Sequence, residues 1–500
     1  MTEEKGSPIP PVLDADDKTA AQTGGSQDGV LAKRTVATAE QEARVVSKLD
    51  WNLMSLFFVL YMLAFLDRGN IGNARIAGLE HDFFPGNSSK YQWLINIFYI
   101  TYVLAEFGVL LWKIFPPHIV GAIVVFHWGL ISTVQAGAQN WSGLMALRFF
   151  LGAFEACYGP GIIYLLSFFY LRHEIGFRCG IFASAAPLAS TFAGALAYGI
   201  TSGHSRLENW RLLFLVEGIP TVLLAAVAYF FIPDSPEKAR FLNAEEKEIV
   251  KSRALRQVGT DANARIGGFN IKDVGAVLLD PIAWMCALMY FAGNVSYSSL
   301  PVFLPTILKD LGYTAINAQG LSAPPSFIAF LCALITTWIA DKTQQRCLVL
   351  FFTSIVGGIG YIVLATVETV GVRYFATFLA SAGVFSTIPN ILALTLNNQG
   401  SDTRRGMSIV LINLVGQTGP FLGTNVFPTK EGPRYVKGMA ICAAFMFFSG
   451  SLAIAQRFLL QWQNRKLDRE YGKPNYTERA GTESDKVALE NYGPNFRYVL

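Results

Sequence analysis

The sequence predicts an all-α integral membrane protein with about twelve spanning helices in two six-helix halves. Hydrophobic residues make up 52% of the 500 residues, and charged residues only 15%, against about 25% in an ordinary soluble domain. Long runs without Asp, Glu, Lys or Arg, such as 114–147, 281–308 and 374–401, exceed the roughly 20 residues that cross a bilayer as helix. A hydrophilic stretch over 233–280 divides these runs into six plus six.

The apolar runs are divided further at Gly, Pro, Asn and charge clusters. The twelve expected segments begin near Trp51, Tyr91, Ile119, Ser142, Gly176, Trp210, Ile282, Gln319, Cys347, Val372, Met407 and Val436. The predicted divisions are a cytoplasmic tail (1–48), the N-terminal half (49–232), a cytoplasmic central loop (233–280), the C-terminal half (281–462) and a cytoplasmic tail (463–500).

The polar segments outside the membrane have their own patterns. Residues 1–48 are rich in Ala, Thr, Asp and Gln and contain no apolar core of the secretory kind, so we expect a disordered tail rather than a signal peptide. In the central loop, Asn243 and Glu246 have the spacing of a helix capping box.

Lys and Arg gather before the first segment, after the fourth, in the central loop and near the C-terminus. The positive-inside rule therefore places both termini in the cytoplasm, and we expect a multi-pass protein of the plasma membrane. In that orientation Asn87, in the sequon NSS, lies in an outer loop and is the expected glycosylation site.

Motifs for enzymatic chemistry are absent from the sequence. It contains no GxxxxGK[ST], HExxH or GxSxG pattern, no CxxC pair, and five histidines without metal-ligand spacing. We therefore expect no enzyme, no bound metal and no cofactor. The small net charge of +4 gives no indication of a nucleic-acid surface.

Four charged residues, Asp67, Arg68, Arg148 and Glu155, lie inside the expected spanning segments. Each such charge costs roughly 2.5–3.5 kcal/mol on insertion scales, so an intramembrane charge indicates a substrate, ion or proton site. Arg148 and Glu155 share one helix face at i and i+7, about 10 Å apart along the axis, too far to neutralise each other.

Helix counting predicts a partner for Arg148. Measured from the expected start at Trp51, Asp67 and Arg68 lie at the depth of Arg148 rather than that of Glu155. We therefore expect Asp67 to pair with Arg148. All four charges lie in the first half, which predicts that the C-terminal half supplies neutral selectivity groups.

Alternatives to a transport role remain at each position. The four charges could form buried ion pairs that only fix helix packing, and Glu106 and Glu217 fit helix packing or a transport path equally. Neutral polar side chains in spanning segments are candidate substrate-binding groups or interhelical hydrogen-bond groups. Those selected for substrate binding are Tyr102, Asn294, Tyr297 and Asn413.

Several motifs together resemble one known family. They are FLDRGNIGN, ALRFFLGAFEACYGPGIIYLLSFFY, WRLLFLVEGIPTVLLA, FIPDSPEKARFL, FLPTILKDLGY, LSAPPSF, LINLVGQTGPFLGTNVFP and GPRYVKG. In this order, over residues 48–462, they resemble the anion:cation symporter family of major facilitators, and within it the fungal allantoate permease group. The motif that closes segment two departs from the family pattern, because this chain reads EFGVLLWKIFPPHIV there.

The resemblance implies proton-coupled transport of a small organic anion such as a carboxylate metabolite or vitamin. By position, Arg68 and Arg148 resemble the arginines that hold the substrate carboxylate, and Asp67 and Glu155 resemble the protonatable pair. Asp341 and Arg346, after segment eight, resemble gating residues. The chemistry is suitable, since guanidinium binds carboxylate through two hydrogen bonds.

Two other functions fit the same fold. One is an exporter of a fungal metabolite, although segment five lacks the GxxxGPxxGG signature and reads FASAAPLASTFAGALAYG. The other is a nutrient sensor that binds its ligand without transport. Uptake of a labelled anion under an imposed proton gradient distinguishes the three.

Overall fold

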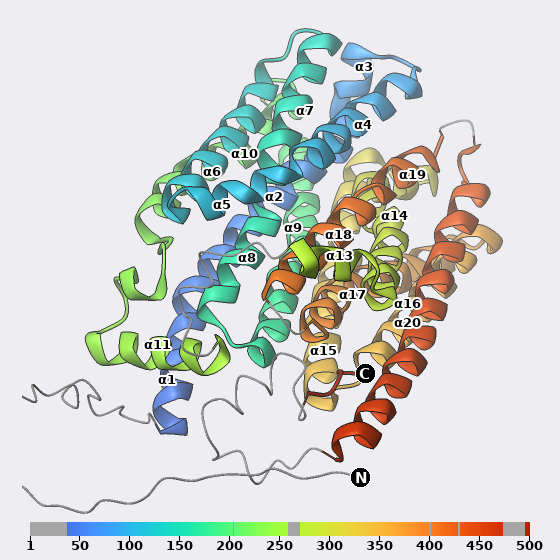
Figure 1. Cartoon of the computed structure of the whole chain (residues 1–500). Helices are drawn as coiled ribbons and strands as arrows, with labels where there is room; N and C mark the ends of the chain where they lie inside the picture. The colour runs from blue at the N-terminus through green and yellow to red at the C-terminus, as the bar shows by residue number, and fades with distance from the viewer. Residues whose placement is uncertain (1–37, 204, 259–270, 400–401, 429–430, 474–495) are drawn as a thin grey trace, which may run out of the picture.

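The computed structural model describes residues 38–203, 205–258, 271–399, 402–428, 431–473 and 496–500. Within these ranges the regular structure is helical. Figure 1 shows two helix bundles side by side, the N-terminal half in blue to green and the C-terminal half in yellow to red. The fold class predicted from the sequence is confirmed.

The N-terminal half consists of six rods, several of them built from consecutive helical pieces. Their bounds are α1 Ala39–Leu49, η1 Asp50–Met54, α2 Ser55–Ala74, η2 Arg75–Leu79 and α3 Glu80–Phe83; α4 Ser88–Ala105, η3 Glu106–Leu110 and α5 Leu111–Ile114; α6 Pro117–Val134 and η4 Gln135–Gly137; α7 Trp141–Ala156 and α8 Gly159–Phe169; α9 Arg172–Ser202; and α10 Asn209–Phe231.

The central loop and the C-terminal half follow. The loop contains η5 Pro236–Lys238, α11 Ala244–Val258 and α13 Ile271–Leu278. The second six rods are α14 Pro281–Asp310, α15 Ala315–Thr343, α16 Arg346–Thr366, α17 Val370–Asn397, α18 Asp402–Gly416 with α19 Gly419–Asn425, and α20 Val436–Tyr471.

Eleven helices in the described ranges are long and apolar enough to cross a membrane. The remaining rod, α14, has 30 residues and is also long enough, but Asn294, Ser296 and Ser298 reduce its apolar character at the middle. All three side chains are buried. The polar positions of α14 therefore face the protein interior rather than lipid.

The expected disordered tail does not hold for residues 38–48. Thr38 and Gln41 form a capping box at the start of α1, and Val45 and Leu49 are buried. An amphipathic helix of this kind is stabilised by burial of its apolar face, which the polar composition of the tail concealed. The rest of the predicted tail, 1–37, lies outside the described residues.

The predicted capping box of the central loop is confirmed. The Asn243 side chain accepts from the Glu246 backbone N–H at 2.8 Å, and the Glu246 side chain accepts from the Asn243 N–H at 2.8 Å. Lys48 also binds Glu246, at 2.7 Å. On the same helix, α11, Arg253 pairs with Glu174 of α9 at 2.5 Å. These bonds hold the loop against the α1 end of the N-terminal half.

The C-terminal residues lie at the same end of the bundle as α1 (Figure 1). Asn398 exchanges two hydrogen bonds with Val499, at 2.8 and 3.0 Å, and Asn464 exchanges two with Tyr498, at 2.8 and 2.9 Å. Phe496 is buried. Residues 496–500 are therefore fixed against the end of the C-terminal half, whereas 474–495 of the predicted tail lie outside the described residues.

The two halves contact each other at both ends. At the α3 end, the Thr424 hydroxyl of α19 donates to Asn96 of α4 at 2.6 Å. At the α1 end, a Cβ added to Gly176 of α9 would lie 2.8 Å from Nη2 of Arg346. These contacts enclose the space between the halves where the polar groups described below converge.

Gly152 allows α7 to approach α4 closely. A Cβ at this position would lie 2.3 Å from the Phe98 carbonyl oxygen and 2.4 Å from Thr101 Oγ1. We expect Gly152→Ala to lower the free energy of unfolding by about 1–3 kcal/mol, the usual effect of overpacking, and to lower the thermal midpoint in detergent. In Gly199→Ala, where no atom lies within 4 Å of the new Cβ, the midpoint should stay or rise. Equal midpoints for the two variants would contradict this close approach.

His118 at the start of α6 binds Asp234, which follows α10. The ring Nδ1 lies 2.6 Å from Oδ1, and the His118 backbone N–H donates to the same oxygen at 3.3 Å. Partial burial acts to raise the pKa of Asp234, but the His118 side chain and backbone hydrogen bonds outweigh it and hold the pKa below its usual range. This contact ties two neighbouring rods together at the α1 end.

A depressed carboxyl pKa makes this contact stabilising at neutral pH. The stabilisation is present above the unfolded value of about 3.9 and is lost as the pH falls through the lower folded value. We expect Asp234→Asn to reduce the free energy of unfolding at pH 7 by about 1 kcal/mol. The difference from wild type should shrink as the pH falls below about 4, and thermal midpoints measured across pH test this. A constant difference down to acid pH would argue against a contribution of the ionised Asp234 carboxylate.

Candidate substrate cavity and buried charges

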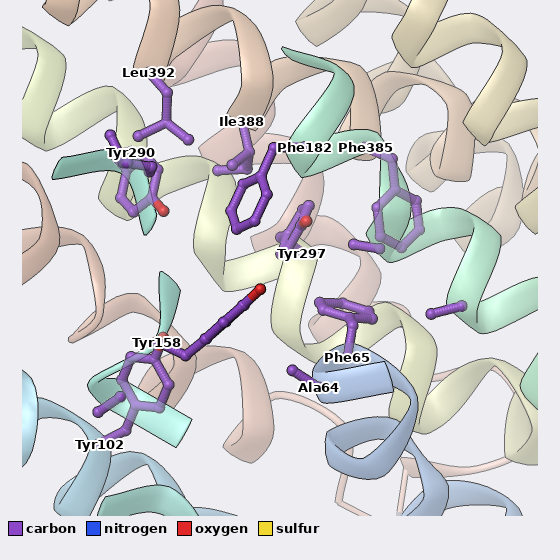
Figure 2. Close-up of a cluster of buried hydrophobic side chains, with 14 of the residues drawn as sticks. Ala64, Phe65, Tyr102, Tyr158, Phe182, Tyr290, Tyr297, Phe385, Ile388 and Leu392 are labelled. Atoms are coloured by element: carbon purple, nitrogen blue, oxygen red, sulfur yellow. The ribbon is translucent and has the colours of Figure 1, made fainter. Parts of the chain in front are cut away.

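A cavity lies between the two halves. Both halves contribute aromatic side chains to its wall, and the C-terminal half also contributes the amides. The lining residues are Tyr61, Arg68, Tyr99, Tyr102, Gly159, Pro160, Ile163, Phe182, Ala183, Tyr290, Asn294, Tyr297, Ser298, Leu392, Asn413, Gln417 and Pro420. Figure 2 shows Tyr102 on one side of this region, with Tyr290 and Tyr297 on the other.

Helix breaks flank the cavity in each half. α7 ends at Ala156 and α8 begins at Gly159, with Pro160 next; α18 ends at Gly416 and α19 begins at Gly419. Non-helical backbone at membrane depth is tolerated where protein or a cavity surrounds it. The Gly-Pro pairs at these two helix breaks therefore position the wall of the cavity.

Arg68 is the cation of the cavity wall. Its Nε and Nη2 donate to Oε1 of Glu155 at 2.8 and 2.5 Å, while Oε2 of Glu155 is buried without a hydrogen-bond partner in the described chain. The guanidinium carbon lies 4.9 Å from the Tyr102 ring centre and 5.3 Å from that of Phe98. Cation–π contacts and one carboxylate oxygen thus hold Arg68, and its side chain remains 12% exposed.

The predicted Asp67–Arg148 pair is wrong. Asp67 is fully buried and accepts from Ser132 at 2.6 Å and Thr221 at 3.0 Å. Successive helix residues diverge by about 100°, so Asp67 faces α6 and α10 while Arg68 faces the cavity. The depth estimate also placed Arg68 too far from Glu155, because it ignored the length of the Arg68 side chain, which reaches Glu155.

Arg148 is placed differently from the other predicted substrate group, Arg68. It is buried and is not among the cavity-lining residues. Its Nη1 donates to the Arg68 backbone carbonyl at 3.4 Å, and its Nε and Nη2 have no hydrogen-bond partner in the described chain. It lies within electrostatic reach of Tyr91, Glu155 and Asp67, so it sits behind the cavity wall.

The four predicted neutral groups, Tyr102, Asn294, Tyr297 and Asn413, all line the cavity. The sequence did not single out Tyr61, although it precedes Arg68 by seven residues and so shares its helix face. Tyr99, Tyr290 and Gln417, which belong to the wider set of neutral polar side chains in the spanning segments, also line the cavity.

The remaining predicted positions lie away from the cavity. Asp341 binds Arg346 at 2.6 Å at the α1 end, and Arg346 is the residue that lies against Gly176 of the other half. Asn87 is exposed at the start of α4 and its side chain caps that helix through the Lys90 N–H. Glu106 is buried in η3, and neither carboxylate oxygen has a partner among the described residues.

A two-half helical bundle with a polar, charged cavity between the halves defines a membrane transporter rather than an enzyme. Residues 57–424 match the model of the Major Facilitator Superfamily, and the chain belongs to that superfamily. This agrees with the six-plus-six architecture and with a site at the interface of the halves.

Curated relatives are also transporters. The chain is 34% identical to "MFS transporter prlL" of Fungal sp. (strain NRRL 50135), over 90% of this chain and 92% of that one. It is 31% identical to the "High-affinity nicotinic acid transporter" of Saccharomyces cerevisiae, over 92% of this chain and 85% of that one.

Solved structures share the fold at low identity. The proton:xylose symporter XylE has a TM-score of 0.61 at 14% identity, covering 82% of this chain and 95% of that chain. A bacterial homologue of the human lysosomal transporter Spinster, in an inward-facing and unoccupied conformation, has a TM-score of 0.61 at 15% identity, covering 85% and 99%.

Proposed function

We propose that this transporter is a proton-coupled symporter of a small organic anion in the plasma membrane, of the anion:cation symporter family and its allantoate permease group. The observation that carries the proposal is the Arg68–Glu155 pair at the cavity wall. Arg68 is the charged residue among the cavity-lining groups, and within the described part of the chain its side chain donates to one oxygen of Glu155.

This pair supports coupling because a substrate carboxylate can replace Glu155 at Arg68, and a proton can replace Arg68 at Glu155. A substrate carboxylate in the cavity competes with Glu155 for the guanidinium of Arg68, since both bind through the same donors. Leaving the Glu155 carboxylate buried and unpaired is costly, so Glu155 takes up a proton when the substrate carboxylate replaces it. Anion and proton therefore bind together and are released together.

The cavity wall supports an aromatic monocarboxylate as substrate. Five tyrosines, Tyr61, Tyr99, Tyr102, Tyr290 and Tyr297, provide ring faces and hydroxyls, and Asn294, Asn413 and Gln417 provide amides. A flat ring stacks on such faces while its carboxylate reaches Arg68. The named nicotinic acid transporter among the relatives makes nicotinate the first compound to test.

We infer that the α1 end faces the cytoplasm. Lys48, Arg178, Arg253, Arg346 and Arg457 lie in the segments that meet at that end, as the positive-inside rule requires of the cytoplasmic side. Asn87 then faces the exterior as the glycosylation acceptor, and both termini are cytoplasmic.

The test is uptake of radiolabelled nicotinate and related carboxylates into proteoliposomes under an imposed pH gradient. Symport predicts accumulation against the anion gradient when the outside is acidic, and its collapse when a protonophore is added. Accumulation driven in the opposite direction would indicate an exporter. Binding without flux of any anion would indicate a sensor, and either result overturns the proposal.

A further inference from the structure

Asp67 lies in a layer of neutral donors between α2, α6 and α10. Its carboxylate accepts from Ser132 Oγ at 2.6 Å, Thr221 Oγ1 at 3.0 Å and Trp128 Nε1 at 3.2 Å. No cation is hydrogen-bonded to it within the described residues. An ionised carboxylate in such surroundings is hydrogen-bonded to neutral donors alone.

A second set of polar side chains comes from the same three helical rods. Asn70, Gln135 and Glu217 are buried, with side chains 0%, 0% and 2% exposed. In the described part of the chain, neither polar atom of any of the three has a hydrogen-bond partner. Buried polar groups are nearly always satisfied by protein or by ordered water, so these three point to a bound polar ligand.

Helix register places the second set directly above the first. Asn70 follows Asp67 by three residues, Gln135 follows Ser132 by three, and Glu217 precedes Thr221 by four, so each pair shares a helix face. The α2 and α6 rods run toward the α3 end. α10 runs back from it, because Trp210 at its start donates to Asp82 at 2.7 Å.

All three unpartnered side chains therefore lie on the α3 side of Asp67. At a rise of 1.5 Å per residue, the second layer is about 4.5–6 Å from the first. Glu217 is also within electrostatic reach of Asp67. We call these six residues, Asp67, Asn70, Ser132, Gln135, Glu217 and Thr221, the polar cluster.

We propose that the polar cluster holds ordered water and that Glu217 and Asp67 form a carboxyl pair that carries one proton between them. The inference deepens the proposed symport and rests on it. A proton leaves the Glu217 carboxyl for a bridging water, and that water passes a proton to the Asp67 carboxylate. One O–H bond breaks and one forms at each step, and the charge of the pair does not change.

The charges around the pair favour this arrangement. Two neighbouring carboxylates in a low dielectric cannot both ionise without a compensating cation. Besides the pair itself, the charged and titratable groups on the surrounding elements are Tyr61 and Arg68 on α2, His118 and His127 on α6, Arg148 and Glu155 on α7, and Arg211 and Tyr229 on α10.

Most of these groups are already directed elsewhere. Arg68 binds Glu155, His127 stacks on Phe154 at 4.7 Å between ring centres, and Arg211 donates to the carbonyls of Ala136 and Ala138 at 2.7 and 2.8 Å. Arg148 remains the cation within electrostatic reach of Asp67. It is therefore the group that would stabilise the pair after the proton has left.

The test is an infrared titration of the reconstituted full-length protein, following the carbonyl band of protonated carboxylic acids across pH. In Glu217→Gln, the carbonyl band of Asp67 should titrate about one pH unit closer to acid, because the negative charge of the neighbouring carboxylate no longer favours protonation of Asp67. If Glu217→Gln does not fold, Asp67→Asn tests the same coupling through the carbonyl band of Glu217. Glu217→Asp keeps a carboxyl at this position, so the coupling that Glu217→Gln removes should be present in it.

Glu106→Gln is the matched control, because Glu106 is also a buried, unpartnered carboxyl but belongs to η3, outside the polar cluster. It should leave the Asp67 titration unchanged. Water bands that shift in H₂¹⁸O should be present in the wild type and lost in Gln135→Leu. Strictly additive spectra for Asp67→Asn and Glu217→Gln, or water bands that Gln135→Leu leaves intact, would overturn the proposal.

The infrared result does not depend on the transported compound. If the two carboxyls are coupled but no anion accumulates under a proton gradient, the proposed symport fails and the carboxyl pair stands. If accumulation is proton-driven but the spectra are additive, the pair fails and symport stands.

Discussion

Replacing Glu155 with glutamine is expected to abolish proton-driven accumulation of the anion while leaving anion exchange intact. Glutamine has nearly the same shape but cannot take up a proton, so the release of Arg68 is no longer tied to protonation. The neutral amide also competes more weakly for Arg68, whose donors reach Glu155 Oε1 at 2.5 and 2.8 Å. Exchange should therefore persist and become less dependent on pH.

Two measurements on the same proteoliposomes test this expectation. Accumulation is measured under a pH gradient, and counterflow is measured without one, with labelled nicotinate as the probe. Glu106→Gln is the control, since it also removes a buried carboxyl but one that does not bind Arg68. Normal accumulation by the Glu155→Gln variant would show that coupling does not pass through this residue.

Much of the fold could be predicted because hydropathy along the chain is a local property. Charge-free runs of sufficient length mark the rods, and the 233–280 stretch marks the division. The sequence did not predict α1, since its stability depends on burial of Val45 and Leu49 against other segments. The sequence also did not predict η3, which interrupts the second rod at Glu106.

The candidate site was less accessible to sequence reasoning. The four intramembrane charges were identified, because their cost makes them conspicuous, but their pairing was not. Pairing depends on which way each helix is rotated and how far a side chain extends, and neither is encoded in depth along one helix. Tyr61 was missed for a related reason: a tyrosine in a spanning segment is unremarkable until its face is known.

The second large effect is expected from Arg68→Lys. Lysine keeps the positive charge but loses the planar set of donors that binds a carboxylate through two bonds, as well as much of the stacking on Tyr102. We expect the affinity for the anion to fall by about 10- to 100-fold, corresponding to about 1.5–3 kcal/mol for a lost charged hydrogen bond. Arg68→Ala would be a poorer test, because an unpaired Glu155 carboxylate costs about 3–5 kcal/mol and threatens the fold.

Arg75→Lys is the matched control. Arg75 lies on the same rod, binds Glu80 at 2.8 Å and stacks over Tyr91 at 4.4 Å, but it does not line the cavity. Its conversion to lysine should change the thermal midpoint about as much as Arg68→Lys and leave the apparent Kd for the anion unchanged. Binding measured by competition against labelled nicotinate separates the two variants. If both lose affinity equally, the loss comes from the altered packing of the first rod, and Arg68 does not hold the substrate carboxylate.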